Sequence, residues 1–136
     1  INIYSLYSYY SRDMVSPGAN AIAQYISSNT KKGDAILLRG GFGGGEKWSL
    51  QYYLQKLSIS DSQLPIFDMF ESYTPGNLAQ LKLVKPQDKI KEILNQYNRV
   101  LFYDMTYETS DIVNAKKNIL GYDKEGKPLI IWEINK

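Results

Sequence analysis

The chain alternates between two kinds of segment, and this alternation constrains its fold more than any other sequence feature. Short continuous apolar runs, which are typical of buried strands, alternate with segments in which apolar residues recur at helical spacing. The strand-like runs cover residues 35–38, 64–70, 99–105 and 129–134. The helical patterns cover residues 16–29, 46–57, 86–97 and 109–120. This order predicts an α/β fold, a three-layer sandwich with helices on both faces of a mostly parallel sheet of about four to five strands.

Residues at the ends of these segments agree with the assignment. Ser16 is suited to cap the first helix, Pro17 suits its first turn, and Gly33 follows its end. Thr109 or Ser110 is expected to cap a fourth helix that ends at Gly121. Residues 78–84 fit a strand and a short helix equally well.

Length and composition indicate one globular domain over residues 1–136. A chain of 136 residues with 43% hydrophobic and 22% charged residues has enough apolar surface for a core. There is no internal repeat, low-complexity tract or linker. No apolar stretch reaches the length of about 18 residues that a membrane-spanning helix needs.

Residues 1–12 form an aromatic N-terminal arm. The first ten include four tyrosines and no charged residue. Tyrosine favours sites that are dry at one end and wet at the other, including membrane interfaces. The arm therefore fits an edge strand or docked segment, which its aromatic content favours, and also a membrane-proximal segment. Because Ile1 stands in place of a starting methionine, we expect the chain to be a piece of a larger protein.

Missing residue types exclude several chemistries. The chain has no histidine and no cysteine, which rules out a Ser-His-Asp triad, thiol catalysis and zinc–thiolate sites. The 16 basic and 14 acidic residues are spread along the chain, and the pair Lys31 and Lys32 is the nearest approach to a basic patch. We therefore predict no catalytic residue, no metal, no cofactor and no nucleic-acid partner. A Ser–Lys site or a tyrosine-based site stays an open alternative, although no motif marks one.

A glycine-rich loop at residues 39–45 lies between a predicted strand and a predicted helix, where phosphate cradles form. Its candidate ligand-binding residues are Gly41, Gly43, Gly44, Gly45 and Lys47. The spacing misses both phosphate fingerprints, because Glu46 replaces a glycine of the dinucleotide motif and separates Gly45 from Lys47. Glu46 also complements the helix dipole and would repel phosphate. A surface loop is favoured over an anion site.

Acidic residues near the strand ends form a second candidate group. Asp68 and Asp104 are its ligand-binding candidates, with Glu71 and Glu108 close in sequence. The carboxyl ends of parallel strands meet at one edge of a sheet, so these carboxylates are in a position to converge. Their spacing matches no metal loop, and solvated loop acids are the favoured interpretation.

Trp48, Tyr52 and Tyr53 are the third candidate group. They fit a stacking platform for a sugar or a base, but at helical spacing an aromatic cluster is more often part of a core.

Four segments resemble the soluble C-terminal domain of bacterial polytopic membrane glycosyltransferases, enzymes similar to dolichyl-phosphate-mannose protein mannosyltransferases and aminoarabinose transferases. Residues 21–38 resemble a helix of the type va-x-yI that runs into gD-x-ill. Residues 48–54 are similar to the aromatic-Tyr-Tyr segment that follows it. Residues 98–103 resemble the family's x-R-V-W strand, and residues 128–133 its terminal strand.

The resemblance implies a non-catalytic accessory domain, because the family's catalytic acids lie in loops between membrane helices. It implies a position on the extracytoplasmic side of the bacterial membrane, tethered by upstream transmembrane helices. The implied partners are the transmembrane part of the same polypeptide and a lipid-linked sugar or its acceptor. Two alternatives stay open: a stand-alone α/β domain that binds a phosphorylated ligand or nucleotide at residues 40–45, and an interaction module without a small ligand.

Overall fold

A computed structural model describes most of the chain, and its sheet has five strands in the order β2-β1-β3-β5-β4. The described residues are 18–39, 45–59, 63–69, 85–104, 112–122 and 126–136. The strands are β1 (Asp34–Arg39), β2 (Ile66–Asp68), β3 (Arg99–Asp104), β4 (Lys116–Tyr122) and β5 (Pro128–Asn135). The helices are α2 (Ala19–Asn29), α3 (Gly45–Lys56) and α5 (Pro86–Leu94).

The sheet is mixed. Strand β1 pairs in parallel with β2 on one side and with β3 on the other. Strand β5 is antiparallel to β3, and β4 is antiparallel to β5. The expectation of a mostly parallel sheet is therefore wrong, since two of the four strand pairings are antiparallel. For β4 and β5 the physical reason is their short connection, which is long enough for a hairpin but too short for a crossover.

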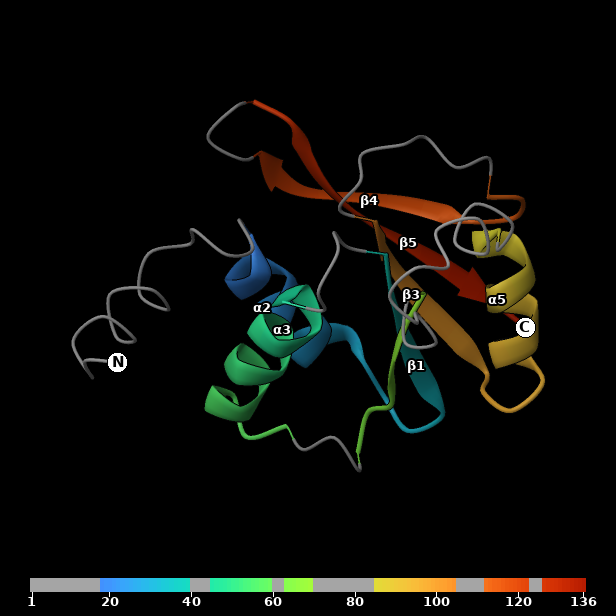
Figure 1. Cartoon of the computed structure of the whole chain (residues 1–136), viewed down its shortest axis with the longest axis horizontal. Helices are drawn as coiled ribbons and strands as arrows, with labels where there is room; N and C mark the ends of the chain where they lie inside the picture. The colour runs from blue at the N-terminus through green and yellow to red at the C-terminus, as the bar shows by residue number, and fades with distance from the viewer. Residues whose placement is uncertain (1–17, 40–44, 60–62, 70–84, 105–111, 123–125) are drawn as a thin grey trace, which may run out of the picture.

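The described helices pack against both faces of the sheet (Figure 1). Helices α2 and α3 cover the face that carries Ile36 and Leu101, whereas α5 covers the face that carries Leu37 and Phe102. Helix α5 contacts β3, the middle strand of the sheet, and its residues Ile90 and Ile93 share a core cluster with residues of β1, β3 and β5. These observations support an α/β fold with an open mixed sheet, and not the regular three-layer sandwich that the alternation predicted.

Helix α2 forms because Ile22, Ala23 and Ile26 recur at helical spacing and are all buried against the sheet. Gly18 is its N-cap residue, whereas the predicted cap, Ser16, lies outside the described residues. Helix α5 begins at Pro86, where a missing N–H costs nothing. None of the helices described here has the length and apolar character that crossing a bilayer requires.

The prediction of a fourth helix over residues 109–120 is wrong in its described part. Asn114 has a φ of 59°, a left-handed conformation that a helix interior does not tolerate. Residues from Lys116 onward pair with β5 instead, for example Ile119 with Ile130. Residues 1–12 and residues 78–84, about which the sequence left alternatives open, lie outside the described ranges.

Candidate functional site

The three parallel strands end at one edge of the sheet, and this edge contains a topological switch point. From β1 the chain runs through α3 to β2, which lies on one side of β1. From β2 it runs through α5 to β3, which lies on the other side of β1. Adjacent strands whose connections diverge in this way open a crevice outside their carboxyl ends, where ligands bind in open α/β sheets. The switch point lies between β1 and β3.

Arg39 and Asp104 occupy this switch point as the last residues of β1 and β3. They are direct partners in the strand register, and Nη2 of Arg39 donates a hydrogen bond to Oδ2 of Asp104 in an ion pair. The exposed fractions of the two side chains are 13% and 6%. The pair links the two strands and reduces the net charge of this edge. Removing either partner would leave a poorly solvated charge.

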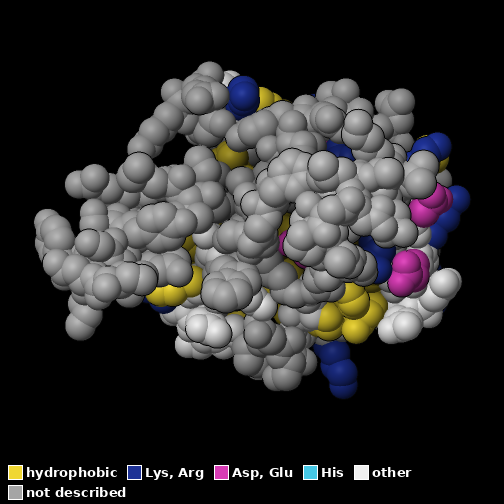
Figure 2. All heavy atoms as spheres, viewed as in Figure 1, with side chains coloured by type: hydrophobic (Ala, Val, Ile, Leu, Met, Phe, Trp, Pro, Cys, Tyr) yellow, Lys and Arg dark blue, Asp and Glu magenta, His cyan; other side chains and the backbone are white. Residues whose placement is uncertain are grey.

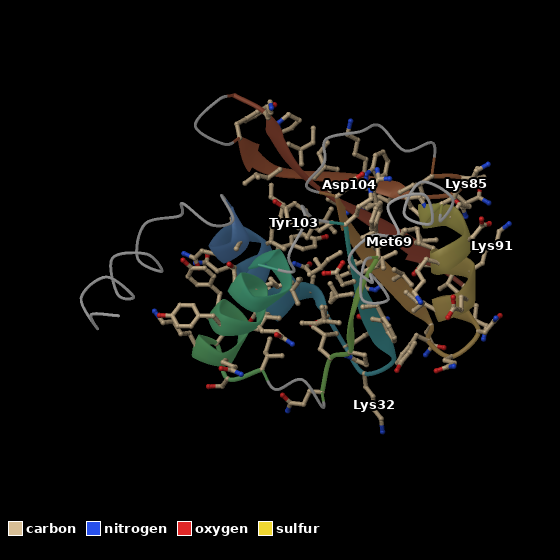
Figure 3. All side chains as sticks on the ribbon, viewed as in Figure 1. Lys32, Met69, Lys85, Lys91, Tyr103 and Asp104 are labelled. Carbon is tan, nitrogen blue, oxygen red and sulfur yellow. The ribbon has the colours of Figure 1, made fainter. Side chains whose placement is uncertain are left out.

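Asp68 lies at the same edge but on the opposite face of the sheet. It is the register partner of Leu38, which belongs to the core under α2 and α3 together with Tyr103. Because successive strand residues alternate between faces, Asp104 points away from the side on which Tyr103 and Asp68 lie. The structure therefore brings the two predicted carboxylates to one edge without placing them on one face. Figure 3 shows Tyr103, Met69 and Asp104 at this end of the sheet.

Most of the glycine-rich loop lies outside the described residues, including Gly41, Gly43 and Gly44. Gly45 is the first residue of α3, and Lys47 lies in the first turn of that helix. The helix therefore begins after the carboxyl end of β1, which is the position that the sequence predicted. Whether these residues hold an anion stays a prediction.

A second charged cluster lies at the opposite, amino end of the parallel strands and is centred on Arg99. Its Nε and Nη2 atoms donate to the two carboxylate oxygens of Asp34 at 3.2 and 2.5 Å. Its Nη1 atom donates to Glu133 at 3.0 Å, and Nη2 also donates to the carbonyl oxygen of Asn29 at 2.6 Å. One guanidinium thus joins β1, β3 and β5 to the end of α2.

Electrostatics at this cluster stabilise the charged form of Arg99. The hydrogen bonds that Arg99 donates to Asp34 raise the pKa of Arg99 above its ordinary value, burial opposes this rise, and Glu133 adds to it. Partial burial and the negative charge of Glu133 likewise raise the pKa of the nearby Tyr25, against the effect of Arg99. Bidentate contact with a fully buried carboxylate indicates a structural clamp.

Sequence reasoning missed the Arg99 cluster. The available signal was a charged residue directly before each of two apolar strands, Asp34 before residues 35–38 and Arg99 before Val100. Adjacent parallel strands that start with opposite charges place those charges side by side. The pairing of β1 with β3 had to be known before this signal could be read.

A surface hollow of about 510 Å³ lies at the amino end of β1 and β2, opposite the switch point. It is lined by Ser27, Thr30, Lys31, Lys32, Ile59, Gln63 and Leu64. Figure 3 shows Lys32 extending away from the body of the domain, at the far end from Asp104. The hollow and the switch point therefore do not form one site.

Two aromatic residues of α3, Tyr52 and Tyr53, have described side-chain contacts. Tyr53 packs against the core cluster, and its ring meets the ring of Tyr52 edge-on with centroids 5.3 Å apart. Nζ of Lys56 lies 4.6 Å from the centroid of the Tyr52 ring. The core interpretation holds for Tyr53, whereas the side chain of Trp48 is not described. In the part of the chain that the structure describes, no three aspartate or glutamate side chains gather closely enough to hold a metal ion.

The fold and its edges define an α/β domain in which ion pairs between strands occupy both ends of the parallel strands. Comparisons with protein-family models, with curated proteins and with solved structures found no match for this chain.

Proposed function

We propose that this chain is a non-catalytic accessory domain of a bacterial membrane glycosyltransferase that transfers sugar from a lipid-phosphate donor. One observation supports the non-catalytic role most directly. Arg39 pairs with Asp104, and Arg99 pairs with Asp34, so these charged groups join one strand to another at both ends of β1 and β3. A general acid or base has to exchange its proton with a substrate, which a carboxylate held by a neighbouring guanidinium does poorly.

The arrangement of the elements adds support for the family. Residues 21–38, which carry the first part of the resemblance, form α2 and β1. Residues 98–103 include most of β3, which lies beside β1, and residues 128–133 include most of β5, which lies beside β3. Three of the four segments that resemble the glycosyltransferase tail therefore contribute the successive strands β1, β3 and β5. The proposal places the domain on the extracytoplasmic side, with the transmembrane part of the same polypeptide as its partner.

The experiment that tests this proposal uses the protein encoded by the complete reading frame. We expect membrane helices upstream of this chain and sugar transfer from a lipid-phosphate donor in membranes that contain the whole protein. Replacing Asp104 by Asn should leave turnover per folded molecule unchanged, and the chain alone should transfer no sugar. A reading frame without upstream membrane helices, or sugar transfer by the chain alone, would contradict the proposal.

A second candidate function is the binding of a phosphorylated ligand or nucleotide at residues 40–45. The observation that favours it is position: Arg39 and the start of α3 both lie at the carboxyl end of β1, where such ligands bind in open α/β sheets. Calorimetry with nucleotides and phosphosugars distinguishes the two candidates. Saturable binding that is lost on replacing Arg39 by Met supports the second candidate, and the accessory role predicts no binding heat.

A further inference from the structure

The hairpin of β4 and β5 contains a bulge that aligns two apolar side chains. Ile119 is the partner of Ile130, and Tyr122 is the partner of Pro128, with a register shift between Ile119 and Gly121. Strand residues three positions apart normally point to opposite faces. The extra residue of the bulge cancels this alternation, so Ile119 and Tyr122 point to the same face.

The two faces of this hairpin differ in what covers them. On one face, Leu120 packs against the core cluster that includes residues of α2, and Leu129 is buried. On the other face, Ile119 and Tyr122 have exposed fractions of 52% and 67%. Helix α5, which lies on that side of the sheet, contacts β3, which is two strands away from β4. The hairpin therefore presents an apolar surface to the outside.

Basic residues flank this surface. Residues 116–128 contain four lysines against two acidic residues. Nζ of Lys117 lies 5.6 Å from the centroid of the Trp132 ring, and the register of β4 and β5 places Lys117 on the same face as Ile119. Figure 2 shows basic and hydrophobic side chains together at the top of the view, where Figure 1 places this hairpin. A tyrosine and an isoleucine flanked by lysines match the chemistry of an anionic membrane interface.

The hairpin also stands beside the point at which the chain enters the described fold. A Cβ atom added to Gly18, the residue before α2, would lie 2.7 Å from the Cδ atoms of Leu129 on β5. Gly18, the first described residue of the chain, therefore lies next to the hairpin. Under the proposed function, the membrane-spanning part of the polypeptide precedes Gly18, so this step rests on the proposed function.

We propose that Ile119 and Tyr122, together with Lys117 on the same face of the hairpin, form a contact surface for the headgroup region of an anionic lipid bilayer. The apolar side chains enter the boundary between headgroups and acyl chains, and the tyrosine hydroxyl stays at the wet side. The side chain of Lys117 keeps its charge at the level of the anionic headgroups. The domain would then lie against the bilayer with one face of its hairpin.

Co-sedimentation of the whole chain with vesicles tests this surface. The vesicles contain either phosphatidylcholine alone or phosphatidylcholine with phosphatidylglycerol. Replacing Ile119 or Tyr122 by Ser should each lower the partition coefficient on anionic vesicles about tenfold. Replacing Lys117 by Gln should lower it about fivefold on anionic vesicles and leave binding to neutral vesicles unchanged. Val113, which is 62% exposed but lies outside the hairpin, provides the matched control, and Val113→Ser should bind like the unchanged chain.

Three results would overturn the proposal. The first is no binding of the unchanged chain to anionic vesicles, and the second is equal binding by the Ile119→Ser and Val113→Ser variants. The third is a dimer in sedimentation analysis that Ile119→Ser converts to a monomer, which would assign the surface to a second copy of the chain. Because residues 1–12 are the same in all variants, their own affinity for lipid cancels. Vesicle binding with a reading frame that lacks membrane helices would keep this surface while removing the proposed function.

Discussion

Gly18, the N-cap residue of α2, has a φ of 87°, a conformation that residues with a Cβ atom rarely adopt. Its position is also crowded, since the Cδ atoms of Leu129 would lie 2.7 Å from an added Cβ. Gly126 has a similar φ of 79°, but no atom lies within 4 Å of the place where its Cβ would stand. The two glycines therefore separate backbone strain from steric crowding.

We expect Gly126→Ala to lower the free energy of unfolding by about 1 kcal/mol, through backbone strain alone. Gly18→Ala should cost about 1–3 kcal/mol more, because Leu129 must also shift. Urea unfolding followed by circular dichroism measures both values. Equal losses in the two variants would show that contact with Leu129 does not restrict residue 18.

Tyr25 gives stability a dependence on alkaline pH. Partial burial and Glu133 raise its pKa, so the folded state favours the neutral phenol. Its contribution is fully present below the unfolded-state pKa of about 10 and is lost as pH rises through the folded-state pKa. We expect the stability difference between the unchanged chain and Tyr25→Phe to shift in favour of Tyr25→Phe between about pH 9 and 11. A difference that stays constant over this range would contradict the expected shift.

At the scale of elements, Arg99 joins three strands and the end of one helix. Asp34 is fully buried, so removing its partner leaves a carboxylate with little solvation. We expect Arg99→Met to lower the free energy of unfolding by about 3 kcal/mol, because the substitution leaves the buried carboxylate of Asp34 without its charged partner. Arg99→Lys should recover only part of this loss, since an ammonium group lacks the bidentate geometry.

The matched control for this substitution is the exposed pair of Lys89 and Glu92 on α5, whose atoms Nζ and Oε1 are 3.3 Å apart. Lys89→Gln should change stability by less than about 0.5 kcal/mol, because exposed pairs within a helix contribute little. Thermal unfolding of the three variants compares them directly. Similar losses of unfolding free energy for Arg99→Met and Lys89→Gln would contradict the proposed role of Arg99 in joining the strands.

The sequence predicted the elements that depend on local periodicity and missed the one that depends on pairing. Helices α2, α3 and α5 and the parallel strands β1 and β3 lie where apolar spacing placed them. The apolar residues Ile112, Val113, Ile119 and Leu120 fit helical spacing, but the segment from Lys116 forms β4. Hydrogen bonds between β4 and β5 outweigh the local helix propensity of this segment. A local sequence pattern does not predict these bonds, because they join separate segments of the chain.

At the scale of the whole molecule, the sheet is stabilised unevenly from its centre to its β4 edge. Strands β1 and β3 are buried on both faces and paired on both sides, whereas β4 is largely exposed and pairs with β5 alone among the described strands. We expect native-state hydrogen exchange to be slowest for amides of β1 and β3 and fastest, within the sheet, for those of β4. Equal protection of β4 and β3, measured by NMR or mass spectrometry, would contradict this gradient.

Composition and apolar periodicity are local properties, and they sufficed to predict an α/β domain without histidine or cysteine chemistry. They also located the strand ends that carry Asp68 and Asp104. The positions of these carboxylates on opposite faces, the pairing of Arg39 with Asp104 and the contact of Arg99 with Asp34 followed from the folded arrangement alone. Strand order and register set these neighbours, and both depend on contacts between residues far apart in the chain, which local patterns do not encode.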